Sequence, residues 1–489
     1  MAESDQGQEL YHEIFGSVLD RSELTPYLLR DCAGYDDALA RAGLMLVNRG
    51  FSMTDGELDS GELARAAGYV RMSLDYLRGS LIPAVSSQLR RLSSLGSSLA
   101  GDYRRAMDSL DAIGTLLFRG ELASLIAEDP RHLFLLASGA KYPHLFRGRP
   151  GAPDRIPPAW RLASCSLLKL CHLVKALEED SQDIFDFAQL GMFFGSRNIP
   201  LTGLFSFAWD DSANEPTEEH ARCAYMKLAA FFRRLSLSVA RDPDSRSLVF
   251  NSGDGVSVEI VDVKARLKSP ESMIAKIGKD ASEEPYGIRD VLAVTFLLKR
   301  REDSLILFHA LQKQGVILQE NIASASVTQT LFDSPADMED SVRALMHALS
   351  LREGRDEDPD ADAVRAASAG FFNALNSNSA ENSHSSGLHR KFQCKLNFSV
   401  PVLHDALTGR IVAHGFAGTS RVRQHTVPVE LRISDIRSWE RSELRGEAHH
   451  AAYKFRQHVV LLNRLFSPLF SFSPDSFAKL REDQNILFR

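Results

Sequence analysis

The chain has 489 residues, a formal net charge of −7, and a composition that is 44% hydrophobic and 25% charged. This is typical of soluble globular protein, and the length predicts two or three domains. The negative charge argues against a non-specific nucleic-acid binder, and the lack of an 18-residue apolar window argues against a membrane span.

The first ten residues are acidic and polar, so they are unlike a secretory signal peptide. The five cysteines are odd in number and form no C-x-x-C pair, so we expect free thiols and no zinc site. Together these features favour a cytoplasmic location.

Residues 1–245 are predicted to form a helical domain of regulatory or scaffolding type. Apolar residues recur at helical spacing in 35–47, 63–81, 93–117 and 218–239. Segment 167–174 is nearly all apolar and is predicted to be buried, and the apolar surroundings of His172 favour a core histidine over a metal ligand. Segment 147–158 holds four prolines and two glycines, which predicts a loop.

Strands alternate with helices beyond the Asp-Pro-Asp-Ser boundary at 242–245. Segment 256–263 is rich in β-branched residues and is predicted to be a strand. If the strand continues, Lys264, Arg266 and Lys268 lie two apart and point to one face.

A helix is predicted directly after this basic strand. Ser269 suits its N-cap, and Pro270 suits its first position. Ser272 and Lys276 then lie four apart on one helical face. Concentrated cations repel one another unless an anion lies among them, so this strand-to-helix corner predicts a polyphosphate site.

The elements that follow complete an α+β domain. We predict a buried central strand at 288–298, helices at 304–314 and 337–351, and a short strand at 316–319. The acidic and polar segment 352–386 is predicted to be a flexible insertion, either a surface loop or a lid. A helix at 435–465 follows the last strand, and the tail, 461–489, is predicted to pack back on the domain.

Two further strands, at 391–400 and 426–433, alternate apolar and polar residues. Gln393 and Lys395 belong to the polar face of the first, and Glu430 and Arg432 face outward from the second. The pattern predicts a sheet that packs on helices on one side and opens to a cleft on the other.

Four motifs in this half resemble those of RelA/SpoT-type (p)ppGpp synthetases, over about residues 246–460. The segment RLKSPESMIAK at 266–276 resembles R-x-K-S-x-x-S-I-x-x-K, and IRDVLAV at 288–294 resembles the strand D-L-x-A-V-R. The segment VELRI at 429–433 resembles E-I-Q-I-R-T. The last motif, with Trp439, His450, Tyr453 and Lys454, resembles the W-x-x-x-E-H-x-x-x-Y-K helix with a longer spacer.

The resemblance implies a nucleotidyltransferase-like mixed sheet flanked by helices, which transfers pyrophosphate from ATP to the 3′-hydroxyl of a guanine or other purine nucleotide. Catalysis and binding of Mg²⁺ would fall to Asp290 and Glu430, with Glu430 as the candidate base. The residues that would bind ATP and its phosphates are Lys264, Arg266, Lys268, Ser272 and Lys276. The residues that would bind the acceptor are His384, His389, Gln393, Lys395, His450 and Lys454.

Each motif also has a structural interpretation. Asp290 could cap a turn or pair with Arg289, and Glu430 could lie on a solvated strand face or pair with Lys395 across strands. The helix at 435–465 could carry ordinary surface charges.

The sequence departs from the family pattern at three positions. Thr295 stands where the family has arginine, His384 stands where it has a guanine-stacking tyrosine, and Ser434 occupies the register of the arginine in E-I-Q-I-R-T. The acceptor is therefore left open between GDP or GTP, an adenine nucleotide and the 3′ end of tRNA. A degenerate nucleotide-binding module without turnover is the alternative to an enzyme. The N-terminal half has no His-Asp dipeptide, so we expect none of the hydrolase activity that many family members carry there.

Overall fold

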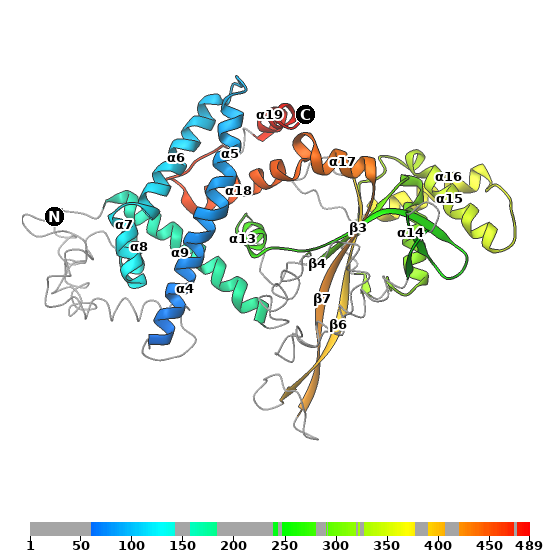
Figure 1. The fold of residues 1–489 in the computed structure, drawn as a ribbon, viewed down its shortest axis with the longest axis horizontal. Coiled ribbons are helices and arrows are strands. Elements are labelled where there is room, and N and C mark those ends of the chain that lie inside the picture. Colours follow the sequence, from blue (N-terminus) through cyan, green and yellow to red (C-terminus); the bar gives the residue numbers. More distant parts are fainter. Residues whose placement is uncertain are drawn as a thin grey trace, which may run out of the picture. The chain divides into compact units, whose positions relative to one another are not determined.

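The computed structural model describes residues 60–141, 157–182, 238–242, 247–279, 290, 292–318, 321–322, 327–376, 390–405, 420–473 and 477–489. Figure 1 shows that helices dominate the first part of the chain and that the strands follow, so the protein is of the α+β class. No helix in the described ranges combines the length and apolar character needed to cross a membrane.

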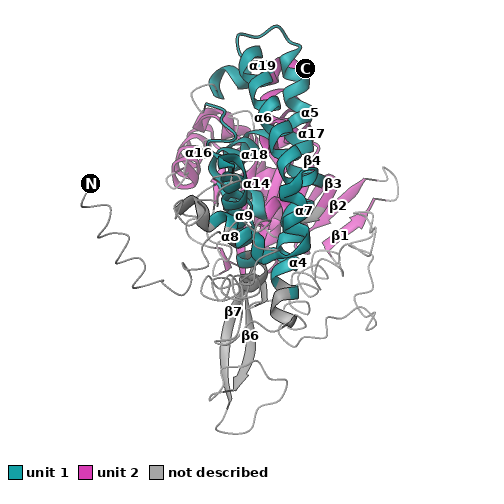
Figure 2. Ribbon diagram, turned by 90° about the vertical axis from the view of Figure 1, so that its left-hand side faces the viewer, with its two compact units in different colours: residues 1–177, 274–281, 455–483 teal, residues 178–273, 282–454, 484–489 magenta. Residues whose placement is uncertain are grey.

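The chain forms two compact units, coloured in Figure 2. Unit 1 comprises residues 1–177, 274–281 and 455–483, and unit 2 comprises 178–273, 282–454 and 484–489. The division does not follow the predicted boundary at 245, because residues 178–245 belong to unit 2 and two segments from the second half of the chain belong to unit 1.

Unit 1 is helical where it is described. Its first helices are α4 (Ser60–Tyr76), the π-helical turn η1 (Leu77–Leu81), α5 (Ile82–Ser93), α6 (Ala100–Phe118), α7 (Glu121–Glu128) and α8 (Pro130–Lys141). The start of α9 (Pro158–Gln182) belongs to it, as do parts of α13 (Pro270–Lys279), α18 (His450–Phe466) and α19 (Phe477–Leu487). The predicted helix at 63–81 is confirmed. The predicted helix at 93–117 begins only at Ala100, after a turn in which Gly96 has φ of 68°.

The predicted packing of the tail, 461–489, on the sheet domain holds only for its end. Residues 461–483 pack inside unit 1, whereas 484–489 belong to unit 2, where the Phe488 ring stacks on His449. The Tyr103 hydroxyl on α6 donates a hydrogen bond to Asp483 Oδ2 over 2.6 Å, and the ring of Phe472 stacks on Tyr103 with 6.0 Å between centroids. On α13, a Cβ at Gly278 would lie 2.3 Å from Leu461 Cδ1, so α13 and α18 pack closely there. In the predicted apolar segment 167–174, Leu167, Leu170 and Cys171 are buried, but Lys169 is exposed.

Unit 2 is built on a seven-stranded mixed sheet. Its strands are β1 (Val239–Arg241), β2 (Leu248–Asn251), β3 (Ser257–Leu267), β4 (Leu292–Leu298), β5 (Thr328–Gln329), β6 (Phe392–Asp405) and β7 (Ser420–Asp435). The strand order is β1-β2-β3-β4-β7-β6-β5, and every pair is antiparallel except β4 with β7. The predicted strands at 256–263, 391–400 and 426–433 are confirmed as β3, β6 and β7. The predicted strand at 288–298 is β4, which begins only at Leu292.

One face of this sheet carries the hydrophobic core. Val263, Phe296, Ile433 and Phe392 lie in register across four strands and are all buried. The helices α14 (Ser304–Lys313), with Leu307 buried, and α15 (Pro335–Arg352) pack against this face. The opposite face carries the polar residues of the same strands, because side chains alternate along a strand.

Two predicted elements, the short strand at 316–319 and the flexible insertion at 352–386, differ in type from the structure. Residues 316–317 form no strand, because Gly315 with φ of 67° turns the chain and both following amides bond to the Leu311 carbonyl. The middle of the segment 352–386, predicted to be a flexible insertion, is the helix α16 (Ala361–Asn376), which packs on α15 through Val364 (Figure 1). Residues 377–389 lie outside the described ranges.

The predicted helix at 435–465 is broken in two. α17 (Ile436–Leu444) ends before a 3₁₀ turn, η7 (Gly446–Ala448), and α18 begins at His450. Gly446 has φ of 60°, a left-handed conformation that interrupts a helix at little cost only in glycine. The predicted loop at 147–158 and the predicted helices at 35–47 and 218–239 lie almost wholly outside the described ranges. At the end of the last one, Val239 is in β1.

Candidate functional site

The polar face of the sheet is organised in two rows of residues that cross four strands. In the first row, Arg266 is opposite Ala293, Ala293 is opposite Glu430, and Glu430 is opposite Lys395. Residues paired in register project from the same face of a sheet. This row therefore brings Glu430 between two positions that the sequence assigned to substrate binding.

The second row lies beside the first, two residues away on each strand. It runs from Lys264 on β3 through Thr295 on β4 and Arg432 on β7 to Gln393 on β6. Because the strand period is two, both rows share the polar face. The face is therefore a mixture of cations, a carboxylate and an amide above an apolar core.

Glu430 is the most enclosed member of this face. It is only 2% exposed, its Oε1 accepts a hydrogen bond from Arg432 Nε over 2.6 Å, and its Oε2 accepts one from Gln393 Nε2 over 2.8 Å. The prediction that Glu430 and Arg432 face outward is right about the sheet face but wrong about solvent. A buried carboxylate needs such partners, because desolvation without them is costly.

Arg432 is the cation around which the acids gather. Burial acts to lower the pKa of its guanidinium, but the charges of Glu430 and Glu443, the hydrogen bond to Glu430 and the charge of Asp290 together raise that pKa above its ordinary value. Arg432 therefore stays charged, and the three carboxylates from three elements lie close enough to act on it.

Asp290 lies just before β4 and is paired with Lys268, which lies just after β3. The Lys268 ammonium donates a hydrogen bond to Asp290 Oδ2, and both residues are buried, at 8% and 9% exposure. The antiparallel register that pairs Leu267 with Leu292 brings these two flanking positions together. Asp290 therefore has a partner from the basic segment. Arg289, its partner in the structural interpretation, lies outside the described residues.

The helix α17 covers part of the polar face. Lys264 Nζ lies 3.5 Å from the centroid of the Trp439 ring, a cation–π contact. One turn later, Glu443 acts electrostatically on Arg432, and its Oε2 lies 4.0 Å from His450 Nδ1 at the start of α18. The helix is held in this place by its N-cap, where Asp435 Oδ1 accepts a hydrogen bond from the Ser438 amide over 2.9 Å.

The other predicted site residues are divided between places. Ser272 lies on α13, where its hydroxyl accepts a hydrogen bond from Ser269, the predicted N-cap. Lys276 lies on the part of α13 that belongs to unit 1, and Lys454 lies at the last position of unit 2 on α18. The predicted acceptor residues His384 and His389 lie outside the described ranges.

The fit of Mg²⁺ to Asp290 and Glu430 is partial. Carboxylate oxygens are the ligands that Mg²⁺ prefers, and one or two of them with substrate phosphates suffice. However, both oxygens of Glu430 already accept hydrogen bonds, and Asp290 Oδ2 is bonded to Lys268. Within the described ranges, no group of three or more His, Cys, Asp or Glu side chains is placed to hold a metal. The ion therefore stays a prediction, and no step is derived through it.

Sequence reasoning missed the roles of Arg432, Trp439 and Glu443 in this site. The spacing of two between Glu430 and Arg432 was the signal for a pair on one strand face. The spacing of four between Trp439 and Glu443 was the signal for one helix face. What the pattern does not reveal is that this helix face lies on this sheet face.

Comparison of the chain with family profiles, with curated proteins and with solved structures found no match in any of the three.

Proposed function

We propose that unit 2 is a nucleotidyltransferase-like domain that transfers pyrophosphate from ATP to the 3′-hydroxyl of a guanine or other purine nucleotide. The observation that carries the proposal is a pair of buried carboxylates far apart in sequence, Glu430 bonded to Arg432 and Asp290 bonded to Lys268, each held by a cation at the sheet. Lys264 adds a further cation on the polar face. Two acids beside several cations are what phosphoryl chemistry on a triphosphate requires.

The cations have the first task in this proposal. A triphosphate carries several negative charges, and its transfer is favoured when fixed positive groups lie where charge develops. Lys264, held over Trp439, and Lys268, held by Asp290, are fixed in this way. When ATP binds, phosphate oxygens would take the place of Asp290 as the partner of Lys268. Asp290 is then the residue that would hold Mg²⁺, which would neutralise charge on the phosphates.

Glu430 has the second task, which is to accept the proton of the attacking hydroxyl. A general base must lie within hydrogen-bond reach of that proton. Its two oxygens are bonded to Arg432 and Gln393, so the incoming hydroxyl must take the place of one of these donors or use a remaining lone pair. Gln393 is neutral and therefore the less costly donor to displace. Lys395, opposite Glu430 in the register, would contact the acceptor nucleotide.

The hydrogen bonds to both oxygens of Glu430 favour one alternative, a nucleotide-binding module without turnover. A carboxylate that is 2% exposed and hydrogen-bonded at both oxygens can serve to hold the sheet face together and never meet a substrate. In that case the cations would still bind a triphosphate, but no proton would be removed from an acceptor.

Transfer from labelled ATP to GDP, GTP, AMP or tRNA, followed by thin-layer chromatography, separates these possibilities. We expect Asp290→Asn and Glu430→Gln each to lower the transfer rate at least about a hundredfold, the scale for losing a catalytic group. Glu259→Gln is the matched control, because Glu259 is a half-exposed carboxylate on β3 whose ion pair, with Lys299 over 3.3 Å, lies outside the proposed site.

The outcomes are distinct. Transfer that survives in both variants would show that Asp290 and Glu430 are not the catalytic acids. If the unaltered protein binds ATP but transfers pyrophosphate to none of the acceptors, only the nucleotide-binding module without turnover remains. Circular dichroism of each variant shows that the fold is kept.

A further inference from the structure

A cavity in unit 2 is lined by eight residues, of which four are arginines, and none of the eight belongs to the proposed catalytic site. Its volume is about 340 Å³. The lining residues are Arg301, Leu331, Asp333, Arg390, Ser438, Arg441, Arg445 and Gly446.

The topology places this cavity at the far end of the sheet from Asp290. Arg301 follows the end of β4, whereas Asp290 precedes its start, and the seven residues of β4 lie between them. At a rise of about 3.3 Å per residue, the two ends of β4 are roughly 20 Å apart. Arg390 precedes β6, whose first residue pairs with Ile433 near the end of β7. The cavity is therefore separate from the proposed catalytic site.

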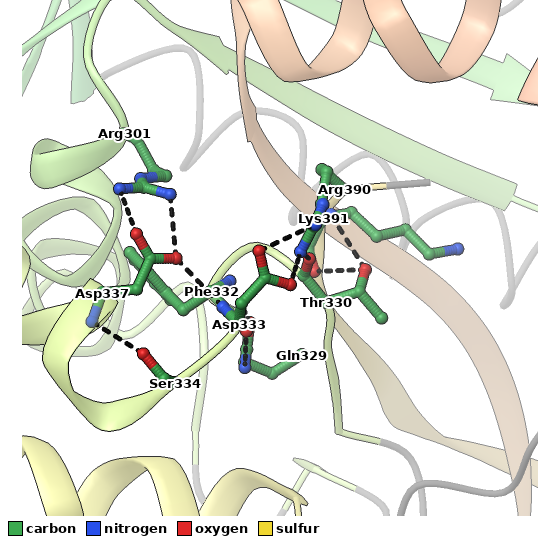
Figure 3. Close-up of polar contacts among 9 residues, drawn as sticks. All are labelled: Arg301, Gln329, Thr330, Phe332, Asp333, Ser334, Asp337, Arg390 and Lys391. Atoms are coloured by element: carbon green, nitrogen blue, oxygen red, sulfur yellow. Dashed lines mark hydrogen bonds and ion pairs between the residues drawn. The ribbon is translucent and has the colours of Figure 1, made fainter. Parts of the chain in front are cut away.

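Two of the arginines are fixed by carboxylates, as Figure 3 shows. Arg301 donates through both terminal nitrogens to Asp337, over 3.0 and 2.7 Å. Arg390 donates in the same way to Asp333, with Nη2 2.8 Å from Oδ2, and also donates to the Thr330 carbonyl over 3.2 Å. Such two-point pairs hold the guanidinium planes in a set orientation before any ligand arrives.

The loop that carries these carboxylates is itself tied down. Asp337 Oδ2 accepts a hydrogen bond from the Asp333 amide over 3.0 Å, and the Asp337 amide donates to Ser334 Oγ over 3.2 Å at the start of α15 (Figure 3). The wall of the cavity is therefore preorganised, which lowers the entropic cost of binding.

The cavity keeps an excess of positive charge. The hydrogen bond from Arg390 lowers the pKa of Asp333, burial opposes this, and the charges of Arg390 and Arg301 lower it further, so Asp333 is ionised at neutral pH. Asp333 and Asp337 offset Arg390 and Arg301. Arg441 and Arg445 are exposed and have no ion pair or hydrogen bond within the described part of the chain.

We infer that this cavity binds the di- or triphosphate group of a small ligand. Planar guanidinium groups match phosphate oxygens with paired hydrogen bonds. Arg441 and Arg445, which have no carboxylate partner among the residues that the structure describes, supply the charge. The Ser438 hydroxyl adds a donor, and Leu331 adds an apolar wall. The inference stands apart from the proposed function, because it uses none of the same residues.

The concave shape favours a compact ligand over a nucleic-acid strand. Arg437 lies one turn before Arg441 on α17, is exposed, and does not line the cavity. An extended polyanion would contact Arg437 as readily as Arg441, because both lie along the same side of the helix. A ligand within the cavity would contact Arg441 alone of the two.

Calorimetric titration of the full chain with inorganic triphosphate tests the inference. We expect Arg441→Ala and Arg445→Ala each to weaken binding at least about tenfold, the scale for one charge-assisted hydrogen bond, and Arg437→Ala to leave it unchanged. Asp333→Asn should change affinity in the opposite direction, because it frees Arg390 for the anion. Arg266→Ala should leave this binding event in place, whether or not a second one exists on the polar face.

Three results would overturn the inference. The first is triphosphate binding that survives in Arg441→Ala and Arg445→Ala. The second is an equal loss in Arg437→Ala, which would indicate an extended face for a strand such as RNA. The third is the loss of all triphosphate binding in Arg266→Ala.

Discussion

Replacing Arg432 by methionine removes the cation on which the acids of the polar face converge. Methionine keeps much of the length and volume of arginine, so the lost charge and the lost hydrogen bond dominate the effect. Breaking a buried ion pair by removing one partner costs roughly 3–5 kcal/mol. Glu430 is 3% exposed at its side chain and keeps the hydrogen bond from Gln393, so we expect a loss of about 3 kcal/mol, at the lower end of that range.

Hydrogen exchange of the backbone amides in β6 and β7 is the suitable assay. The protein has two compact units, so its unfolding is not one two-state transition, whereas exchange reports the local opening free energy of each segment. A loss of about 3 kcal/mol corresponds to exchange that is roughly a hundredfold faster. Arg441→Met is the matched control, because Arg441 is exposed and has no partner among the described residues.

The double variant Arg432→Met with Glu430→Gln provides the sharper test. Without a buried charge to stabilise, the double variant should regain most of the lost protection, so that the two substitutions are strongly non-additive. Unchanged exchange in β7 of Arg432→Met, or no recovery in the double variant, would refute the role given to this ion pair.

Two further predictions concern buried groups outside that pair. Tyr103→Phe should speed hydrogen exchange in α6 by a factor that corresponds to about 1–3 kcal/mol, because the buried Asp483 carboxylate loses the hydroxyl that donates to it over 2.6 Å. Unchanged exchange would show that this hydrogen bond adds nothing to stability. Burial and the charge of Glu430 raise the pKa of Cys394 to about 12, so iodoacetamide at pH 8 should modify the half-buried Cys165 well before Cys394. Because the folded pKa lies above the ordinary value, this thiol's contribution to stability is complete below about pH 9 and is lost as the pH rises toward 12. Equal modification of both thiols at pH 8 would contradict the buried placement of Cys394.

Much of the sheet domain was predictable from local pattern. Alternation in 391–400 and 426–433 assigned Cys394 and Leu431 to the core and Glu430 to the other face, and the structure confirms this. Ser269 and Pro270 correctly marked the start of α13. These predictions succeed because strand period and helix capping depend on neighbours in sequence.

The errors have physical causes of two kinds. The helix α16 lies between acidic and polar runs, and the composition of its surroundings hid the apolar spacing of Val364 and its neighbours that anchors it on α15. The break before α18 had a local signal in Gly446, which the long apolar pattern outweighed. The burial of Glu430 and the partial burial of Arg432 had no local signal, because they depend on α17 folding back over the sheet.

The most direct test of the central claim is a crystal structure of the protein with a non-hydrolysable ATP analogue and Mg²⁺. The account predicts the triphosphate on the polar face, with its oxygens at Lys268 and Lys264 and the ion between Asp290 and a phosphate. A nucleotide bound elsewhere, with the Lys268–Asp290 pair and the hydrogen bonds of Glu430 unchanged, would contradict it.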